Sequence, residues 1–151
     1  MSDREAWGVT LLRVVLGTIL VMHGWFGMMV LGPAGLASYA GRLGYPHSLG
    51  MLFAWYLIVA HIAGGVLLVI GLWTRPAALA QFPVLASTTF FLHWSQGFFM
   101  KNVVVDSRTG ETMTGGYEFS LLMLAASLSV ALLGPGKLSV DQGRPPRFEI
   151  P

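Results

Sequence analysis

Four long apolar stretches dominate this sequence, and their lengths constrain the fold more than any other feature. They cover residues 7–31, 52–73, 77–99 and 117–133. About 20 helical residues cross a hydrocarbon layer of about 30 Å, so the first three stretches are long enough, and the fourth is long enough if its ends are interfacial. The pattern predicts an all-α integral membrane protein, a four-helix bundle that forms a single domain over residues 1–151.

Composition agrees with a membrane protein. Of the 151 residues, 54% are hydrophobic and 11% are charged. The mean hydropathy is +0.66, so the chain is far more apolar than a soluble domain of its length. Cysteine is absent, which excludes structural disulfides, thiolate metal ligands and dithiol redox chemistry within this chain. We expect contact with a lipid bilayer and none with nucleic acid, and any electron transfer requires a cofactor or another subunit.

The basic residues predict the orientation of the bundle. Six of the nine lysines and arginines fall on the side that holds both termini. These six are Arg4, Arg13, Arg75, Lys137, Arg144 and Arg147. Because the opposite side has only Arg42, Lys101 and Arg108, the positive-inside rule places both termini in the cytoplasm. A cleaved secretory signal is the competing interpretation of the first stretch, but that run is too long, and Asp3 and Glu5 dilute the positive charge before it.

The connections between the stretches differ in character. Residues 36–43 are amphipathic enough for a short helix at the membrane interface. Residues 101–116 contain three consecutive valines, a turn-forming segment and two threonines, which predicts an outward loop or β-hairpin. Pro83 predicts a kink in the third stretch. The tail, residues 134–151, is rich in proline, glycine and charge, and we expect an irregular cytoplasmic end.

Four ionisable residues lie inside the apolar stretches or at their ends, one in each: His23, His61, His93 and Glu118. Ionisable groups are costly in hydrocarbon, so we expect these residues to be functional. Counting the helical rise from the outer ends places all four in the outer half of the bundle. They are therefore the candidate ligand or metal residues.

Several interpretations of this group stay open. Imidazole nitrogens and a carboxylate could bind zinc, copper or non-haem iron, two histidines could hold a haem, or the same groups could exchange protons with a quinone. Each of these requires the side chains to converge. The structural alternative is that each histidine only hydrogen-bonds a neighbouring helix.

Other polar and small residues are predicted to be structural. Gly64 and Gly65 share a helical face with the second histidine, and such small residues mark close contacts between helices. Arg13 can snorkel to the cytoplasmic headgroups, or it can reach Gln81 on the third helix or Asp141 on the tail. We expect these three polar residues to anchor the bundle.

Short motifs along the chain follow a definite order. They are Leu11, Leu12 and Arg13 with Gly17, His23 and Gly24; Gly44, Tyr45 and Pro46; residues 64–72 with Thr74 and Arg75; Gly116, Tyr117 and Glu118; and residues 134–141. In this order and spacing they resemble the DoxX family over nearly the whole chain. The resemblance implies a small multi-pass protein of the bacterial inner membrane with four helices.

The resemblance also bears on function. The family is similar to the small membrane subunit of thiosulfate:quinone oxidoreductase, and other members are linked to membrane oxidoreductase complexes, which implies a redox or quinone-associated role. Arg13, His23 and Glu118 match polar residues of the family. The chain departs from the family pattern at His61, where a glutamate is usual, and at Gly27, where a lysine commonly follows the His-Gly pair. Imidazole in place of a carboxylate favours a soft or borderline metal.

Two functional hypotheses follow. The first is a subunit of a membrane redox process, in which His61 and His93 act as ligands or proton carriers, Glu118 admits protons and His23 supports them. The second is a non-catalytic scaffold or assembly factor that binds a protein partner through the outward hairpin or the interfacial helix. Both are compatible with a partner subunit or a homo-oligomer, and neither requires that this chain alone be an enzyme.

Overall fold

Most of the described residues are helical, in agreement with the predicted all-α class, and the rest form two short strands and the connecting turns. The computed structural model describes residues 1–42, 44–100, 103–105, 112–114 and 116–143. The α-helices are α1 (Asp3–Phe26), α2 (Gly32–Arg42), α3 (His47–Val59), α4 (Gly65–Ile70), α5 (Thr74–Leu79), α6 (Phe82–Ser87) and α7 (Glu118–Leu133). Three π-helical segments are η1 (Gly27–Leu31), η2 (Ala60–Gly64) and η3 (Thr88–His93), and two 3-10 turns are η4 (Trp94–Gln96) and η5 (Val140–Gly143).

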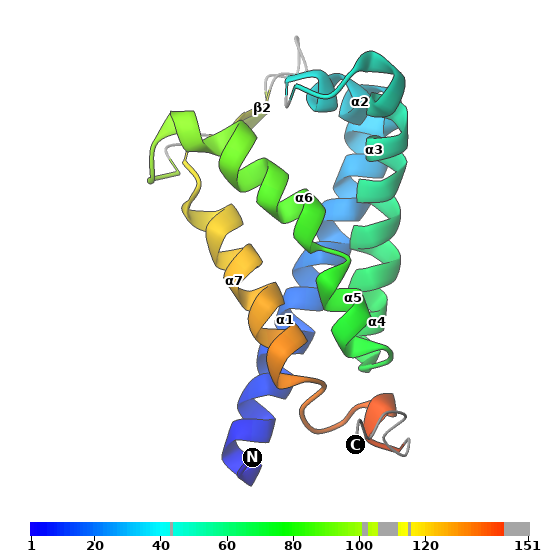
Figure 1. Ribbon diagram of the computed structural model, residues 1–151, viewed down its shortest axis with the longest axis vertical. Helices are drawn as coiled ribbons and strands as arrows, with labels where there is room; N and C mark the ends of the chain where they lie inside the picture. Colours follow the sequence, from blue (N-terminus) through cyan, green and yellow to red (C-terminus); the bar gives the residue numbers. More distant parts are fainter. Residues whose placement is uncertain (43, 101–102, 106–111, 115, 144–151) are drawn as a thin grey trace, which may run out of the picture.

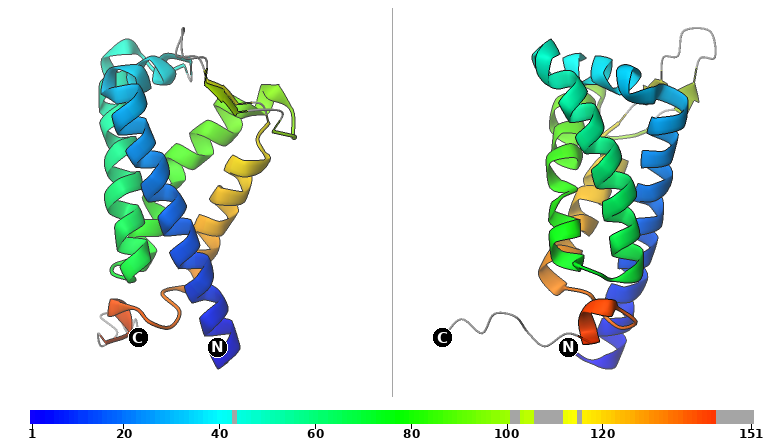
Figure 2. Two further views of the ribbon diagram at one scale, coloured as in Figure 1. Left: turned by 180° about the vertical axis from the view of Figure 1, so that it is seen from behind. Right: turned by 90° about the vertical axis from the view of Figure 1, so that its right-hand side faces the viewer.

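Two helical runs are long and apolar enough to cross a membrane, Asp3–Ser38 and Leu49–Ile70. The first begins at a capping box, in which Ser2 and Glu5 satisfy each other's backbone N–H groups. It turns at Gly32, whose φ of 67° suits glycine, so that α2 lies across one end of the molecule (Figure 1; Figure 2, right). Residues 36–43 were predicted to lie at the membrane surface, and α2 includes all of them except residue 43, which lies outside the described residues.

The third apolar stretch is divided, although the sequence predicts one helix over residues 77–99. Helix α5 ends at Leu79, and α6 begins at Phe82 with Pro83 in its first turn. Proline has no N–H to donate and its ring clashes with the preceding turn, which explains the break. At the break, the carbonyl of Ala80 accepts a hydrogen bond from the hydroxyl of Tyr56 (2.6 Å).

The main hydrophobic core joins four of the helical runs. Its buried members are Leu16, Leu20, Leu68, Ala77, Ala78, Leu85, Met123, Leu124 and Val130. Glycines bring α1 and α4 unusually close, because a Cβ at Gly17 would lie 2.7 Å from the carbonyl oxygen of Gly65. A smaller cluster packs α2 against α3 through Leu36, Ala54 and Ile58.

Figures 1 and 2 show that both termini lie at one end of the molecule, whereas α2 and the strands lie at the other. The strands β1 (Val103–Val105) and β2 (Thr112–Thr114) pair antiparallel, with Val104 opposite Met113. The predicted hairpin turn, residues 106–111, lies outside the described residues.

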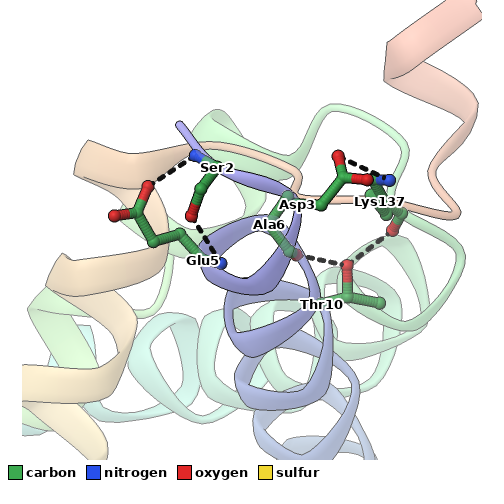
Figure 3. A network of polar contacts seen from close by, with 6 residues as sticks. All are labelled: Ser2, Asp3, Glu5, Ala6, Thr10 and Lys137. Atoms are coloured by element: carbon green, nitrogen blue, oxygen red, sulfur yellow. Dashed lines mark hydrogen bonds and ion pairs between the residues drawn. The ribbon is translucent and has the colours of Figure 1, made fainter.

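The described part of the tail, residues 134–143, has no regular helix or strand before the short turn η5, as expected, but it is packed against the rest of the protein. It folds back against the start of α1, as Figure 3 shows. Lys137 forms an ion pair with Asp3 (2.9 Å), and its carbonyl accepts a hydrogen bond from the hydroxyl of Thr10 (2.7 Å). A Cβ at Gly136 would lie 2.7 Å from the carbonyl oxygen of Ala6. The tail therefore forms part of the packed structure, and residues 144–151 lie outside the described residues.

Candidate functional site

His61 is the most deeply buried of the four predicted site residues. It lies in the π-helical segment η2 and is 7% exposed. Its Nδ1 has no hydrogen-bond partner of ordinary geometry among the described residues. Single π-helical turns inside α-helices occur frequently at functional sites, and a buried polar atom without a partner is rare in folded proteins. Both observations mark His61 as a candidate binding residue.

Gln81 is the hydrogen-bonding side chain that faces His61. It is fully buried and lies at the break between α5 and α6, where its carbonyl accepts a hydrogen bond from the backbone N–H of Leu85 (3.0 Å). Its Nε2 donates to the carbonyls of Ala60 (2.6 Å) and Ala77 (3.3 Å), which fixes the orientation of the amide. Its Oε1, like Nδ1 of His61, has no hydrogen-bond partner among the described residues. Two buried side chains from two different helical runs therefore face each other in an apolar interior, with no other hydrogen-bond partner for these two atoms among the described residues.

Glycine makes room for this pair. A Cβ at Gly64 would collide with Nε2 of Gln81, and a Cβ at Gly65 would lie 2.8 Å from the carbonyl oxygen of Gly17. Gly64 and Gly65 are both buried. Gly64 thus lets Gln81, at the break between α5 and α6, approach η2 closely. Gly65 does the same for helix α1.

His23 lies next to this pair on α1. A Cβ at its neighbour Gly24 would lie 2.9 Å from Cβ of His61, and the two imidazoles are close enough to interact electrostatically. The His23 ring is exposed and stacks on Phe119 of α7, with centroids 5.6 Å apart. Its Nδ1 donates to the carbonyl of Ile19 (2.9 Å). His23 therefore stands between the buried pair and the surface.

The other two predicted site residues have different surroundings. His93 is half-buried at the end of η3. Glu118 starts α7, and its Oε1 accepts a hydrogen bond from the backbone N–H of Met100 (2.9 Å), while its own N–H donates to the carbonyl of Phe98 (3.1 Å). Among the described residues, no group of three or more histidine, cysteine, aspartate or glutamate side chains could hold a metal ion.

Arg13 and Asp141 lie at the opposite end, near the termini. Arg13 is fully buried, and its guanidinium donates to the carbonyls at the end of α4, Leu68 and Val69, and to the carbonyl of Leu138 on the tail (3.1 Å). The carboxylate of Asp141 accepts from the N–H groups of Trp73 (2.9 Å) and Thr74 (2.8 Å). Arg13 thus contacts the tail carbonyls, and none of its hydrogen bonds is to Gln81.

Sequence reasoning missed two features of this site. Gln81 was expected only to anchor the bundle, although a glutamine two residues before a proline in an apolar run could have indicated a polar side chain at a helix break. Phe119 was not singled out, because its contact with His23 depends on how α1 and α7 are rotated. The sequence carries no signal for that rotation.

Long apolar helices and a small buried polar site define an integral membrane protein of the helical class. The family model for DoxX matches residues 8–94, which is more than half of the chain, and the chain belongs to the DoxX family. The matched range includes His23, His61 and Gln81, whereas Glu118 and the tail lie beyond it. No curated protein and no solved structure matches the chain.

Proposed function

We propose that this protein is a subunit of a membrane redox process, and that His61 and Gln81 bind the headgroup of a quinone. The observation that carries the proposal is this buried pair: apart from each other's side chain, Nδ1 of His61 and Oε1 of Gln81 have no hydrogen-bond partner among the described residues. Leaving a buried polar atom unsatisfied costs about 1–3 kcal/mol. A ligand that satisfies both atoms recovers that free energy when it binds.

The chemistry of a quinone suits this pair. Reduction of a quinone to a quinol takes up two electrons and two protons and turns two carbonyl acceptors into hydroxyl donors. The imidazole of His61 can donate or accept a hydrogen bond according to its tautomer, and Oε1 of Gln81 accepts one. In this proposal His23, which is exposed and interacts electrostatically with His61, exchanges protons with it. The electrons must come from a redox centre on a partner subunit, because the chain has no cysteine for dithiol chemistry.

A quinone fits this donor set better than the metal or haem sites considered from the sequence. The group that faces His61 is an amide, which is a poor ligand for zinc, copper or iron compared with imidazole or thiolate. His23 is stacked on Phe119, and Glu118 contacts the N–H of Met100. These contacts favour a hydrogen-bonding site for an organic headgroup.

The same proposal includes a four-helix topology in a bacterial inner membrane. The four spanning units are α1 with η1, α3 with α4, α5 with α6 and η3, and α7. Arg4, Arg75 and Lys137 belong to the end of the molecule that holds both termini (Figure 1), which supports a cytoplasmic position for that end under the positive-inside rule.

The test is a titration of the purified protein with a short-chain quinone, in which the quenching of tryptophan fluorescence reports binding. We expect His61→Leu and Gln81→Leu each to weaken binding about tenfold, the effect of losing one buried hydrogen bond of about 1.4 kcal/mol. Thr10→Ala is the matched control, because it removes a buried hydroxyl that donates to the carbonyl of Lys137 (2.7 Å) at the end with the tail, away from the pair. Equal affinities for all the variants would favour the scaffold function instead.

A further inference from the structure

The side-chain amide of Gln81 can accept a hydrogen bond from its surroundings but has no proton left to donate. Its Nε2 carries two protons, and the carbonyls of Ala60 (2.6 Å) and Ala77 (3.3 Å) accept both of them. Turning the amide over would place its oxygen against these two carbonyl oxygens, so its orientation is fixed. Oε1 is therefore a buried acceptor that requires a donor.

His61 is the residue that can supply this donor. It is the side chain that faces Gln81, and Oε1 has no other partner among the described residues. A neutral imidazole has one N–H group and one ring nitrogen that only accepts. In the protein without a ligand, one N–H group is enough, because Oε1 is the one acceptor that His61 has to satisfy.

A quinone brings a second acceptor to the same imidazole, because its carbonyl oxygens carry no proton. Neutral His61 can satisfy either Oε1 of Gln81 or the quinone, and the acceptor that is left unpaired in the interior is costly. An imidazolium has an N–H group on each ring nitrogen and satisfies both acceptors at once. Hydrogen bonds on both sides also make the buried charge tolerable. The complex therefore needs one proton more than the protein without a quinone.

We propose that the protein takes up one proton when it binds a quinone, and that His61 holds this proton between Oε1 of Gln81 and a quinone carbonyl. This uptake rests on the proposed function and gives the site a property of its own. One of the two protons that reduction consumes is in place before the electrons arrive. A quinol has hydroxyl donors for the accepting nitrogen of His61, so it binds without taking up a proton.

His23 is the neighbouring group through which the proton can enter. Helices α1, α3, α4 and α5 pack against η2, and among their described residues the titratable or charged side chain that faces His61 is His23 of α1. Its Nδ1 donates to the carbonyl of Ile19 (2.9 Å), so the proton of neutral His23 is already in use. Two neighbouring imidazolium charges repel each other, so the two histidines hold one added proton between them. The exposed ring of His23 links it to the surface.

Quinone binding measured at several pH values tests the uptake. The protein in lipid nanodiscs is titrated with a short-chain quinone, whose carbonyls do not titrate between pH 6 and pH 8. Because the complex holds one proton more, the affinity must fall as the pH rises, and we expect a fall of about three- to tenfold per unit, tenfold being the limit for one proton. A pH indicator in weak buffer at pH 7 should report uptake of about one proton per quinone. A constant affinity without uptake would overturn the proposal.

Two variants test whether the added proton is on His61. In His61→Gln, one amide nitrogen carries two protons and serves both acceptors without a charge, so we expect an affinity that does not change with pH. Gln81→Leu removes one of the two acceptors, so a neutral imidazole is sufficient and the pH dependence should again be lost. His23→Gln is the control and should keep the pH dependence of the parent. Loss of the dependence in His23→Gln and its retention in His61→Gln would place the proton on His23 and contradict the proposal.

The proton uptake and the proposed function can fail separately. Quinone binding with an affinity independent of pH would refute the uptake and leave the binding site. No binding to the parent protein at any pH would refute both. The same short-chain compound in its reduced form, kept without oxygen, should bind without proton uptake. Equal uptake with the quinone and the quinol would also refute the proposal, because a quinol brings its own donors.

Discussion

Arg13 illustrates how this chain keeps a full charge in an apolar interior. A buried charge is costly unless it is hydrogen-bonded. The guanidinium meets this condition with carbonyls at the end of α4, where the helix dipole is negative, and with carbonyls of the tail. Asp141 lies near enough to add an attractive interaction. The arginine therefore links three segments that are remote in sequence.

Replacement of this arginine should be strongly destabilising. We expect Arg13→Leu to lower the free energy of unfolding by about 3 kcal/mol, because the partner carbonyls lose their donor within a buried site. Unfolding by sodium dodecyl sulfate in mixed micelles measures this change. Arg75→Leu is the control, because Arg75 lies near the same end with an exposed side chain, and a loss of equal size there would contradict a specific role for Arg13.

Among the elements, the contact between α1 and α4 depends on glycine. We expect Gly17→Ala to lower the free energy of unfolding by about 1–3 kcal/mol, since its Cβ would lie 2.7 Å from the carbonyl oxygen of Gly65 and the backbones must separate. Gly8→Ala on the same helix meets nothing within 4 Å and should be neutral or stabilising by up to about 1 kcal/mol. The same unfolding assay compares them, and equal stabilities of the two variants would contradict close packing.

The tail acts as a cap for the start of α5. Asp141→Ala removes two acceptors from the N–H groups of Trp73 and Thr74, and we expect a loss of about 1–2 kcal/mol, as for other helix caps. Thermal unfolding followed by circular dichroism measures the effect. The neighbouring Gln142→Ala changes an exposed side chain and should leave the melting temperature unaltered. A melting temperature of Asp141→Ala equal to that of the parent would refute the cap.

For the whole molecule, the sequence predicts the helical class and the family better than the internal arrangement. Hydropathy locates the apolar runs, because the thickness of the hydrocarbon layer sets their length. It does not locate the break at Ala80 and Gln81, since Pro83 is compatible with either a kinked or an interrupted helix. The packing of the tail against α1 was also not predicted, because the glycines and prolines of residues 134–141 indicate an irregular segment but not what it contacts.

The candidate site was predicted only in part, because the sequence determines depth along a helix but not the direction in which a side chain points. Counting residues assigns depth along a helix, and it placed His23 and His61 in one layer. Whether the candidate side chains converge depends on the rotation of each helix about its axis. Sequence periodicity does not determine that rotation in a run that is apolar on all faces. The structure brings His61 together with Gln81 and His23, whereas Glu118 contacts Met100.

We propose that the pair of His61 and Gln81 holds a quinone. The quinone content of the protein, extracted from its membrane in polymer-bounded lipid discs, tests this directly. Mass spectrometry of the extracted lipid gives the ratio of quinone to protein. We expect stoichiometric quinone in the parent protein and in Thr10→Ala, and in His61→Leu only the level expected from bulk lipid. Quinone at the bulk level in the parent protein, or undiminished in His61→Leu, would contradict it.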